Sequence, residues 1–222
     1  MKSIWPCLLF LIALGCATPT PDSTPASTPT DAQPGALFTT LEERFLNADT
    51  VFLNFHVSAA GVIDADIRGR LEVIAGNAVR LTGSGEFAGQ PVDLLIWPKG
   101  EQIELGNGTD KTIVPKPAAL REALLVGFTR MGILHNLARL TGSLPPDQAD
   151  GGVHDWVLVD SFAQDPIESG AITFDLSLAG QRVGSAWILT DESGRPVRRL
   201  QTVRFPAGEM RVVERYSNVI IE

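Results

Sequence analysis

The stretch that decides the fold reads FLNFHVSAAG (52–61), IRGRLEVIAG (67–76) and AVRLTGSGEF (78–87). In all three segments apolar and polar residues alternate, as expected when successive side chains point to opposite faces of a sheet. Turn residues separate the segments, at Gly61 and at Gly76-Asn77, and no intervening segment is long enough for a crossover helix. The pattern predicts consecutive antiparallel strands joined by tight turns.

The same alternation continues over most of the chain and gives way twice to helical spacing. Helices are predicted over residues 36–47 and 117–140, the second beginning with Pro117 and ending at Gly142. Further strands are predicted over residues 92–97, 103–105, 156–159, 172–178, 183–189, 197–205 and 210–221. About ten antiparallel strands with two helices indicate an α+β domain, mostly antiparallel β, in which an unclosed half-barrel wraps around one or two helices.

The second predicted helix has an unusual surface. Residues 123–134 are apolar on nearly all sides and are interrupted only by Thr129 and Arg130. Such a helix must be covered on most sides or face another apolar body. Gly127 and Gly132 lower its intrinsic stability and permit a kink or close packing.

The N-terminus predicts an exported protein. Lys2 precedes an uncharged run, residues 4–14, which is too short to span a bilayer and matches an export signal. The run ends in ALGC (13–16), which resembles the bacterial lipobox with its first two positions exchanged. The resemblance implies cleavage before Cys16 and lipidation of that cysteine. The alternative is ordinary export with cleavage after Ala17.

A tether is predicted after the cysteine. Residues 17–35 contain five prolines, five threonines and no aliphatic side chain larger than alanine, so they bury too little apolar surface to order themselves. We therefore expect a lipoprotein signal peptide (1–15), the lipidated Cys16 with a disordered tether (16–35) and one domain (36–222). Cys7 leaves with the signal, which excludes a disulfide scaffold and a thiolate metal site in the domain.

Charge limits the possible partners. The net charge is −8, which argues against general binding to nucleic acid or to an anionic membrane surface. Arginines are nevertheless concentrated near the C-terminus, and we interpret them as the solvated face of adjacent strands: Arg195, Arg198, Arg199, Arg204, Arg211 and Arg215.

No catalytic motif emerges from the sequence. The three histidines, His56, His135 and His154, lack metal-ligand spacing. Ser84 lies in TGSG, without the first glycine of a nucleophile elbow, and GNGTDK (106–111) lacks the spacing and the helix of a P-loop. Asp64 and Asp66 are interpreted as a solvated turn. The protein is therefore predicted not to be an enzyme, and neither a cofactor nor a metal is expected.

The order of elements and several turn phrases resemble the LolA and LolB family of lipoprotein-localisation proteins. The similarity lies in the strands quoted above, in the hairpin LLIWPKGEQIELGNG (94–108), and in AWILTDESGRPVRRLQTVRF (186–205) followed by MRVVERYSNVIIE (210–222). It covers nearly all of residues 36–222. The resemblance implies an unclosed barrel lidded by helices, with an apolar cavity that takes acyl chains. A LolB-like member would itself be a lipoprotein, whereas LolA-like carriers are soluble.

Residues expected to face the interior are the candidate lipid-binding residues. They are Leu53, Phe55, Leu71, Leu81, Phe87, Leu94, Ile96, Leu124, Phe128, Met131, Phe174, Leu176, Trp187 and Leu189. The alternative is that these side chains simply pack against one another as a core. We propose that the helical members, Leu124, Phe128 and Met131, form part of a lid that contacts cargo.

The sequence thus predicts a membrane-anchored envelope lipoprotein, in the outer membrane and facing the periplasm, that binds acyl chains of a lipid or lipoprotein. The membrane would be a partner through the lipidated N-terminus, nucleic acid would not be a partner, and no protein partner is indicated. The second hypothesis is a structural or sensory interaction module on the same fold with a filled core. An open apolar cavity of several hundred Å³ favours the first hypothesis, and a filled interior favours the second.

Overall fold

The computed structural model describes residues 33–74, 78–142, 158–163, 171–178 and 181–222. Cys16, most of the predicted tether, His154 and the loop over residues 143–152 lie outside the described residues. The described residues form two helices and eleven strands: α1 (Pro34–Asn47), β1 (Val51–Gly61), β2 (Ala65–Ile74), β3 (Ala78–Phe87), β4 (Gln90–Lys99), β5 (Gln102–Asn107), β6 (Asp110–Pro115), α2 (Leu120–Gly142), β7 (Leu158–Asp160), β8 (Ala171–Leu178), β9 (Gln181–Thr190), β10 (Pro196–Phe205) and β11 (Gly208–Ile221).

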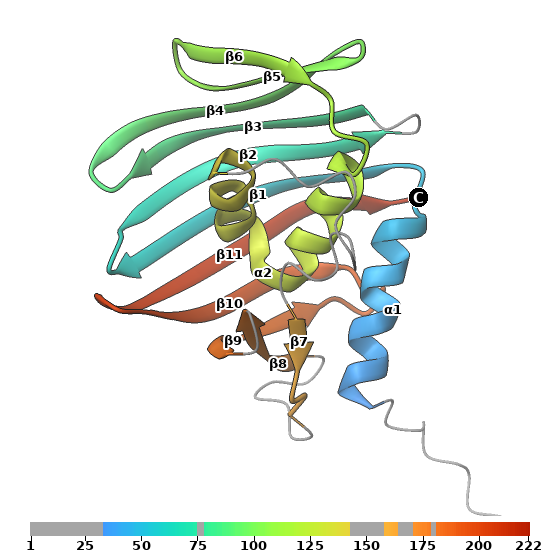
Figure 1. Cartoon of the computed structure of the whole chain (residues 1–222). Helices are drawn as coiled ribbons and strands as arrows, with labels where there is room; N and C mark the ends of the chain where they lie inside the picture. Colours follow the sequence, from blue (N-terminus) through green and yellow to red (C-terminus); the bar gives the residue numbers. More distant parts are fainter. Residues whose placement is uncertain (1–32, 75–77, 143–157, 164–170, 179–180) are drawn as a thin grey trace, which may run out of the picture. The chain divides into compact units, whose positions relative to one another are not determined.

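All eleven strands form one antiparallel sheet in the order β6-β5-β4-β3-β2-β1-β11-β10-β9-β8-β7. The sheet is not closed, because in the part of the chain that the structure describes no strand pairs with the outer side of β6 or of β7. The first and last strands are neighbours at its centre, where Thr50 and Glu222 exchange backbone hydrogen bonds of 2.7 and 3.0 Å. Both helices lie on the same face of the sheet (Figure 1). The predicted fold class, an unclosed antiparallel half-barrel around helix, is confirmed.

The starts of both helices differ from the prediction, and one strand was not predicted. Helix α1 begins at Pro34, so Pro34 and Gly35 belong to the helix and not to the predicted tether. Helix α2 begins at Leu120. Strand β6 was not predicted, because Asp110–Pro115 is an edge strand with mostly exposed side chains and its sequence reads as a turn.

The face of the sheet that carries the helices holds the core. Leu53 on β1 lies opposite Leu71 on β2, which lies opposite Leu81 on β3, and all three are at most 1% exposed. Next to this row the ring of Phe55 occupies the space left by Gly69, where a Cβ would approach the Phe55 ring to 2.3 Å. Leucines and an aromatic ring stacked on glycines thus make the inner layer of the sheet dense.

The helices complete this core. The ring of Phe38 on α1 lies 4.8 Å from that of Phe174 on β8, edge to face. Arg130 on α2 makes a two-point ion pair with Glu42 on α1, at 2.7 and 2.8 Å. Arg121 donates to the carbonyls of Leu46 and Ala48 and so ties the end of α1 to the start of α2. Neither helix among the described residues is long and apolar enough to cross a bilayer.

Candidate functional site

Most of the candidate lipid-binding residues lie in the buried core. Ten of them are members of one cluster and are at most 6% exposed: Leu53, Phe55, Leu71, Leu81, Ile96, Leu124, Phe128, Met131, Phe174 and Leu176. Phe87 and Leu94 are partly buried and pack against that cluster.

The predicted inward orientation of Trp187 and Leu189 is wrong. On β9 these two residues alternate with Ala186 and Ile188, and only the latter two belong to the core cluster. Trp187 instead lies on the outer face, where the guanidinium carbon of Arg198 is 5.4 Å from the centroid of the Trp187 ring. Residues 186–189 are apolar on both sides of the strand, so alternation alone does not reveal which side faces inward.

The first half of α2 fills the centre of the half-barrel. The ring of Phe128 lies 5.1 Å from those of Phe45 and Tyr216, edge to face in both pairs. Phe128 is 3% exposed. In the present conformation its surface is therefore covered by side chains of α1 and β11, as in an ordinary core.

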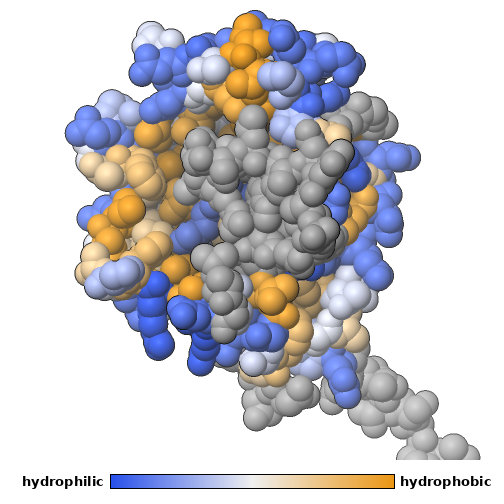
Figure 2. Space-filling model, viewed as in Figure 1, coloured by the Kyte–Doolittle hydropathy of each residue, from blue (hydrophilic) through white to orange (hydrophobic). Residues whose placement is uncertain are grey.

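A hollow remains where β3 to β6 curve away from the helices. Its volume is about 340 Å³, and it lies between these strands and Leu137 in the second half of α2. Three of the predicted residues line it, namely Leu81, Leu94 and Ile96, together with Leu95, Leu105, Gly106, Asn107, Asp110, Thr112, Val114 and Leu137. Figure 2 shows apolar surface over the upper strands of this face. Most of the lining is aliphatic, with polar side chains from Asn107, Asp110 and Thr112.

The residues of this hollow that the sequence did not single out come from two places. Leu105 lies on a strand that was predicted from its alternation with Ile103, and it pairs with Ile96 and Thr112. Val114 lies on the unpredicted β6. Leu137 lies beyond the residues 123–134 that drew attention to the helix.

A break in α2 separates its two halves. Gly132 has φ 75° and ψ 176°, a conformation essentially restricted to glycine. The chain folds back at this point, so that Asn136 in the second half lies on Gly127 in the first and donates to the carbonyl of Leu124 at 3.0 Å. The kink that Gly127 and Gly132 were expected to permit is therefore present, at Gly132.

Two fully buried charged residues of the sheet cap the broken helix. Arg199 on β10 donates to the carbonyls of Thr129 and Arg130, at 2.8 and 2.5 Å. Glu214 on β11 accepts from the backbone N–H groups of Ile133 and Leu134, at 2.9 and 3.1 Å. A cation thus caps a helix C-terminus and an anion caps a helix N-terminus, which is the favourable sense for both helix dipoles.

This capping corrects the interpretation of the arginine cluster. Arg199 is 0% exposed, because alternation along β10 places it on the inner face with Gln201 and Val203. Arg204, Arg211 and Arg215 are exposed, and Arg195 and Arg198 are partly exposed. The predicted solvated face is therefore present without Arg199.

The polar network around these caps shifts several pKa values. Burial lowers the pKa of Arg199, and Glu214 opposes that shift. Burial and then Glu214 raise the pKa of Tyr216 well above its ordinary value, so its hydroxyl stays protonated and donates to Glu214. Burial, with the charge of Arg199, lowers the pKa of His135 to about 4, so this ring is neutral at pH 7.

Both histidines in the described part of the chain have a polar partner. His56 pairs with Asp66 at 2.9 Å on the outer face, and the Nδ1 of His135 accepts from Gln201 at 3.2 Å. Within the described ranges no three His, Cys, Asp or Glu side chains gather as metal ligands would.

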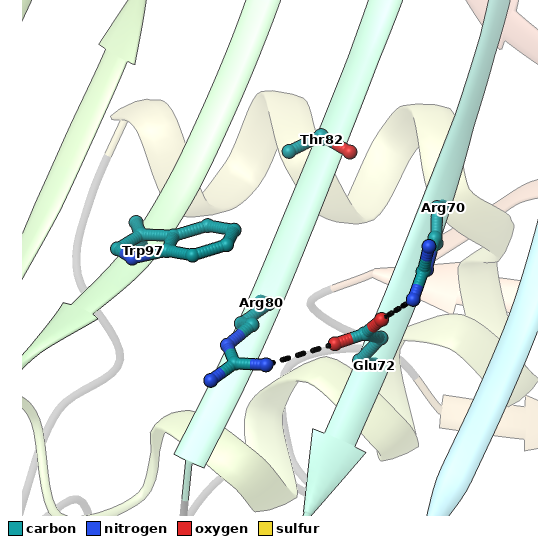
Figure 3. A pocket seen from close by; sticks show the side chains of 5 residues that line it. All are labelled: Arg70, Glu72, Arg80, Thr82 and Trp97. Carbon is teal, nitrogen blue, oxygen red and sulfur yellow. Dashed lines mark hydrogen bonds and ion pairs between the residues drawn. The ribbon is translucent and has the colours of Figure 1, made fainter.

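A second hollow lies on the outer face of the sheet. Arg70, Glu72, Arg80, Thr82 and Trp97 line about 190 Å³ across β2, β3 and β4 (Figure 3). Glu72 accepts from Arg70 and from Arg80, and the guanidinium of Arg80 lies 5.0 Å from the centroid of Trp97. Each cation here already has a carboxylate partner.

No family model and no curated protein matches this chain, and the matches found are to solved structures. It is similar to a LolA superfamily protein from Nitrosomonas europaea (11% identity, 86% of this chain and 94% of that one, TM-score 0.42). It is also similar to a domain assigned to outer membrane lipoprotein sorting from Vibrio parahaemolyticus (8%, 86% and 92%, TM-score 0.32) and to a DUF1329 family protein from Desulfovibrio piger (8%, 85% and 92%, TM-score 0.29). These likenesses identify no ligand or partner for this chain.

Proposed function

We propose that the chain is a lipid-anchored protein of the bacterial cell envelope, and that it binds acyl chains of a lipid or lipoprotein in the hollow between β3–β6 and Leu137. The hollow is the observation that supports this most directly, because its lining is mostly aliphatic and it borders the core. Its volume of about 340 Å³ falls at the lower end of the roughly 300–1,000 Å³ typical of small-molecule pockets. Each methylene buried there would contribute about 0.8 kcal/mol.

The second half of α2 is the part of the proposed site that would move. Leu137 lies on that half, beyond the break at Gly132, so displacing it would widen the hollow toward the core. Leu124, Phe128 and Met131 lie before the break, on the half that would stay in place, and would contact the cargo once the second half had moved away. The break at Gly132 is the hinge of this proposal, because no continuous α-helical hydrogen-bond ladder crosses it. Opening would have to break the bond from Asn136 to Leu124 and the cap that Glu214 provides.

The anchor and the location belong to the same proposal. Lipidation of Cys16 and the tether after it would hold the domain near a membrane, with the outer membrane facing the periplasm as the proposed site. The resemblance of the sequence to the LolA and LolB family agrees with that location. Binding would be noncovalent, with no catalytic step and no cofactor.

A pair of neighbouring residues on β6 allows a sharp test. Val114 lines the hollow, whereas Ile113 points to the outer face and is 51% exposed. Val114→Glu should weaken binding of a fluorescent fatty acid about tenfold or more, because a carboxylate in the lining must be desolvated when the chain enters. Ile113→Glu, with the same change in charge on the same edge strand, should leave binding unchanged. Parent protein that binds no probe across several chain lengths would overturn the proposal.

The burial of ten predicted residues in one cluster favours a second candidate function. In this alternative the filled half-barrel is a structural or sensory interaction module, and the hollow is an incidental gap at its edge. The same titration separates the two functions, since such a module would bind no acyl probe. If the protein is such a module, Val114→Glu should keep the fold and the stability of the parent, and neither protein should bind the probe.

A further inference from the structure

A row of basic side chains crosses the outer face of the sheet at one register. Arg198 on β10 is the ladder partner of Arg215 on β11, Arg215 is the partner of His56 on β1, and His56 is the partner of Arg68 on β2. Ladder partners point to the same face, and neighbouring strands lie about 4.8 Å apart. Four basic residues therefore lie within roughly 15 Å on the face opposite the helices.

This row has an excess of positive charge. One carboxylate, that of Asp66, is shared by two members of the row: it accepts from His56 at 2.9 Å and from Arg68 at 3.1 Å. Among the described residues no carboxylate lies within ion-pair distance of Arg198 or Arg215; Arg198 instead covers the ring of Trp187. Like charges placed directly opposite each other destabilise a sheet, and here they occur in a chain of net charge −8.

The hollow in Figure 3, which shares only β2 with this row, differs in this respect. There Glu72 lies between Arg70 and Arg80 and is bonded to both. Its exposed fraction is only 14%, so the carboxylate is already enclosed by its two partners. An anion entering that hollow would have to compete with Glu72, whereas Arg215 has no such competitor among the described residues.

A depression lies in the middle of the basic row. It measures about 300 Å³, and its walls are side chains that can all donate hydrogen bonds: Asn54, His56, Arg68, Arg215 and Ser217. Its floor is formed by Gly69, which has no side chain, and by the inward-facing Phe55 and Tyr216, which offer main-chain atoms. Asp66 bonds to His56 and Arg68 from the neighbouring row, outside this lining.

We propose that this depression binds a phosphate group, with Arg215 and Arg68 on its two sides and Asn54 and Ser217 as neutral donors. Guanidinium groups match phosphate oxygens in bidentate geometry, and a charge-assisted hydrogen bond is stronger than a neutral one. The phosphate would belong either to a lipid headgroup or to a free phosphorylated molecule. The site lies on the face opposite the acyl hollow and does not depend on acyl binding.

The experiment has two arms, both on the full chain. Calorimetric titration with inorganic phosphate, at constant ionic strength, tests a free ligand. Co-sedimentation with vesicles of equal parts phosphatidylcholine and phosphatidylglycerol, compared with phosphatidylcholine alone, tests a headgroup. Arg215→Gln should lower the affinity about tenfold in whichever arm shows binding, because it removes a charge-assisted hydrogen bond. Arg204→Gln is the matched control, since Arg204 is exposed on β10 outside the depression, and it should change the affinity less than twofold.

The outcomes are separable. Binding in the phosphate arm supports a free ligand, and binding to phosphatidylglycerol vesicles alone supports a headgroup. Arg215→Gln should unfold in urea at the same or a higher concentration than the parent, because Arg215 is exposed and faces another arginine. Absence of binding in both arms would overturn the proposal, and so would an equal loss in Arg204→Gln, which would indicate nonspecific attraction to arginine.

Discussion

Arg199 and Glu214 lie opposite each other on β10 and β11, and each caps one of the two helix ends that meet at Gly132. Both are fully buried, so their charges are compensated by each other's field and by the helix dipoles and not by water. Tyr216 adds a hydrogen bond to Glu214, and Gln201 accepts from Arg199. The sheet thereby holds α2 in its broken conformation.

Replacing one of the two capping residues should lower the free energy of unfolding by more than the loss of its own hydrogen bonds, because its partner is left as an uncompensated buried charge. Arg199→Met leaves the carbonyls of Thr129 and Arg130 without their donor and Glu214 without a compensating charge. We expect the free energy of unfolding to fall by about 3–5 kcal/mol, the range for breaking a buried charge pair. Urea denaturation followed by circular dichroism measures this change.

The double variant Arg199→Met/Glu214→Leu is the control for that interpretation. It leaves no uncompensated charge, so its destabilisation should be smaller than the sum of the two single variants. Strict additivity would show that the two caps act independently and that their charges do not stabilise each other.

Gly132 should resist substitution more strongly than a second glycine that has a similar φ. Its φ of 75° disfavours any other residue, and a Cβ would lie 2.7 Å from the carboxylate of Glu214. Gly89 in the β3–β4 turn has a similar φ of 73°, but a Cβ added there would have no atom within 4 Å. Gly132→Ala should therefore destabilise the fold by at least about 2 kcal/mol more than Gly89→Ala. Equal losses would mean that the contact with Glu214 adds no measurable cost.

These elements show what the sequence could predict. Alternation over residues 51–87 was enough for β1 to β3, because each of these strands has one apolar side. The break in α2 could be anticipated from Gly132, since glycine tolerates the backbone conformation that a break requires.

The caps could not be predicted in the same way. Arg199 and Glu214 are near in sequence to other arginines and glutamates, and only the pairing of β10 with β11 and their position under α2 make them partners. Likewise, the face of Trp187 depends on the register of β9 with β8 and β10, because the strand is apolar on both sides. Long-range register, and not local pattern, decides such residues.

His135 should make stability depend on pH below neutrality. Its pKa is lowered to about 4 in the folded state, against about 6.5 when unfolded, so the unfolded chain binds a proton first as the pH falls. The stability is complete above about pH 6.5 and is lost between about pH 6.5 and 4, by at most about 3 kcal/mol. His135→Leu should reduce this dependence. The urea midpoints of the parent and of His135→Leu, each measured at pH 7 and at pH 5, test this prediction. The titration of carboxylates contributes equally to both proteins, so it cancels when their two pH dependences are subtracted. Parallel pH profiles would contradict the prediction.

The two cysteines of the chain, Cys7 and Cys16, allow a matched test of the proposed anchor. Cys16 ends the uncharged run and precedes the Pro/Thr-rich segment, so Cys16→Ser should remove the lipid and move the protein from the membrane pellet to the soluble exported fraction. Cys7 lies within the proposed signal, which processing would remove, so Cys7→Ser should leave the distribution unchanged. Fractionation of cells followed by immunoblotting measures both variants. Membrane partitioning that survives Cys16→Ser, or a mature N-terminus at Thr18, would show ordinary export instead. In that case the domain could still bind acyl chains, but as a soluble carrier, because nothing would tether it to the bilayer.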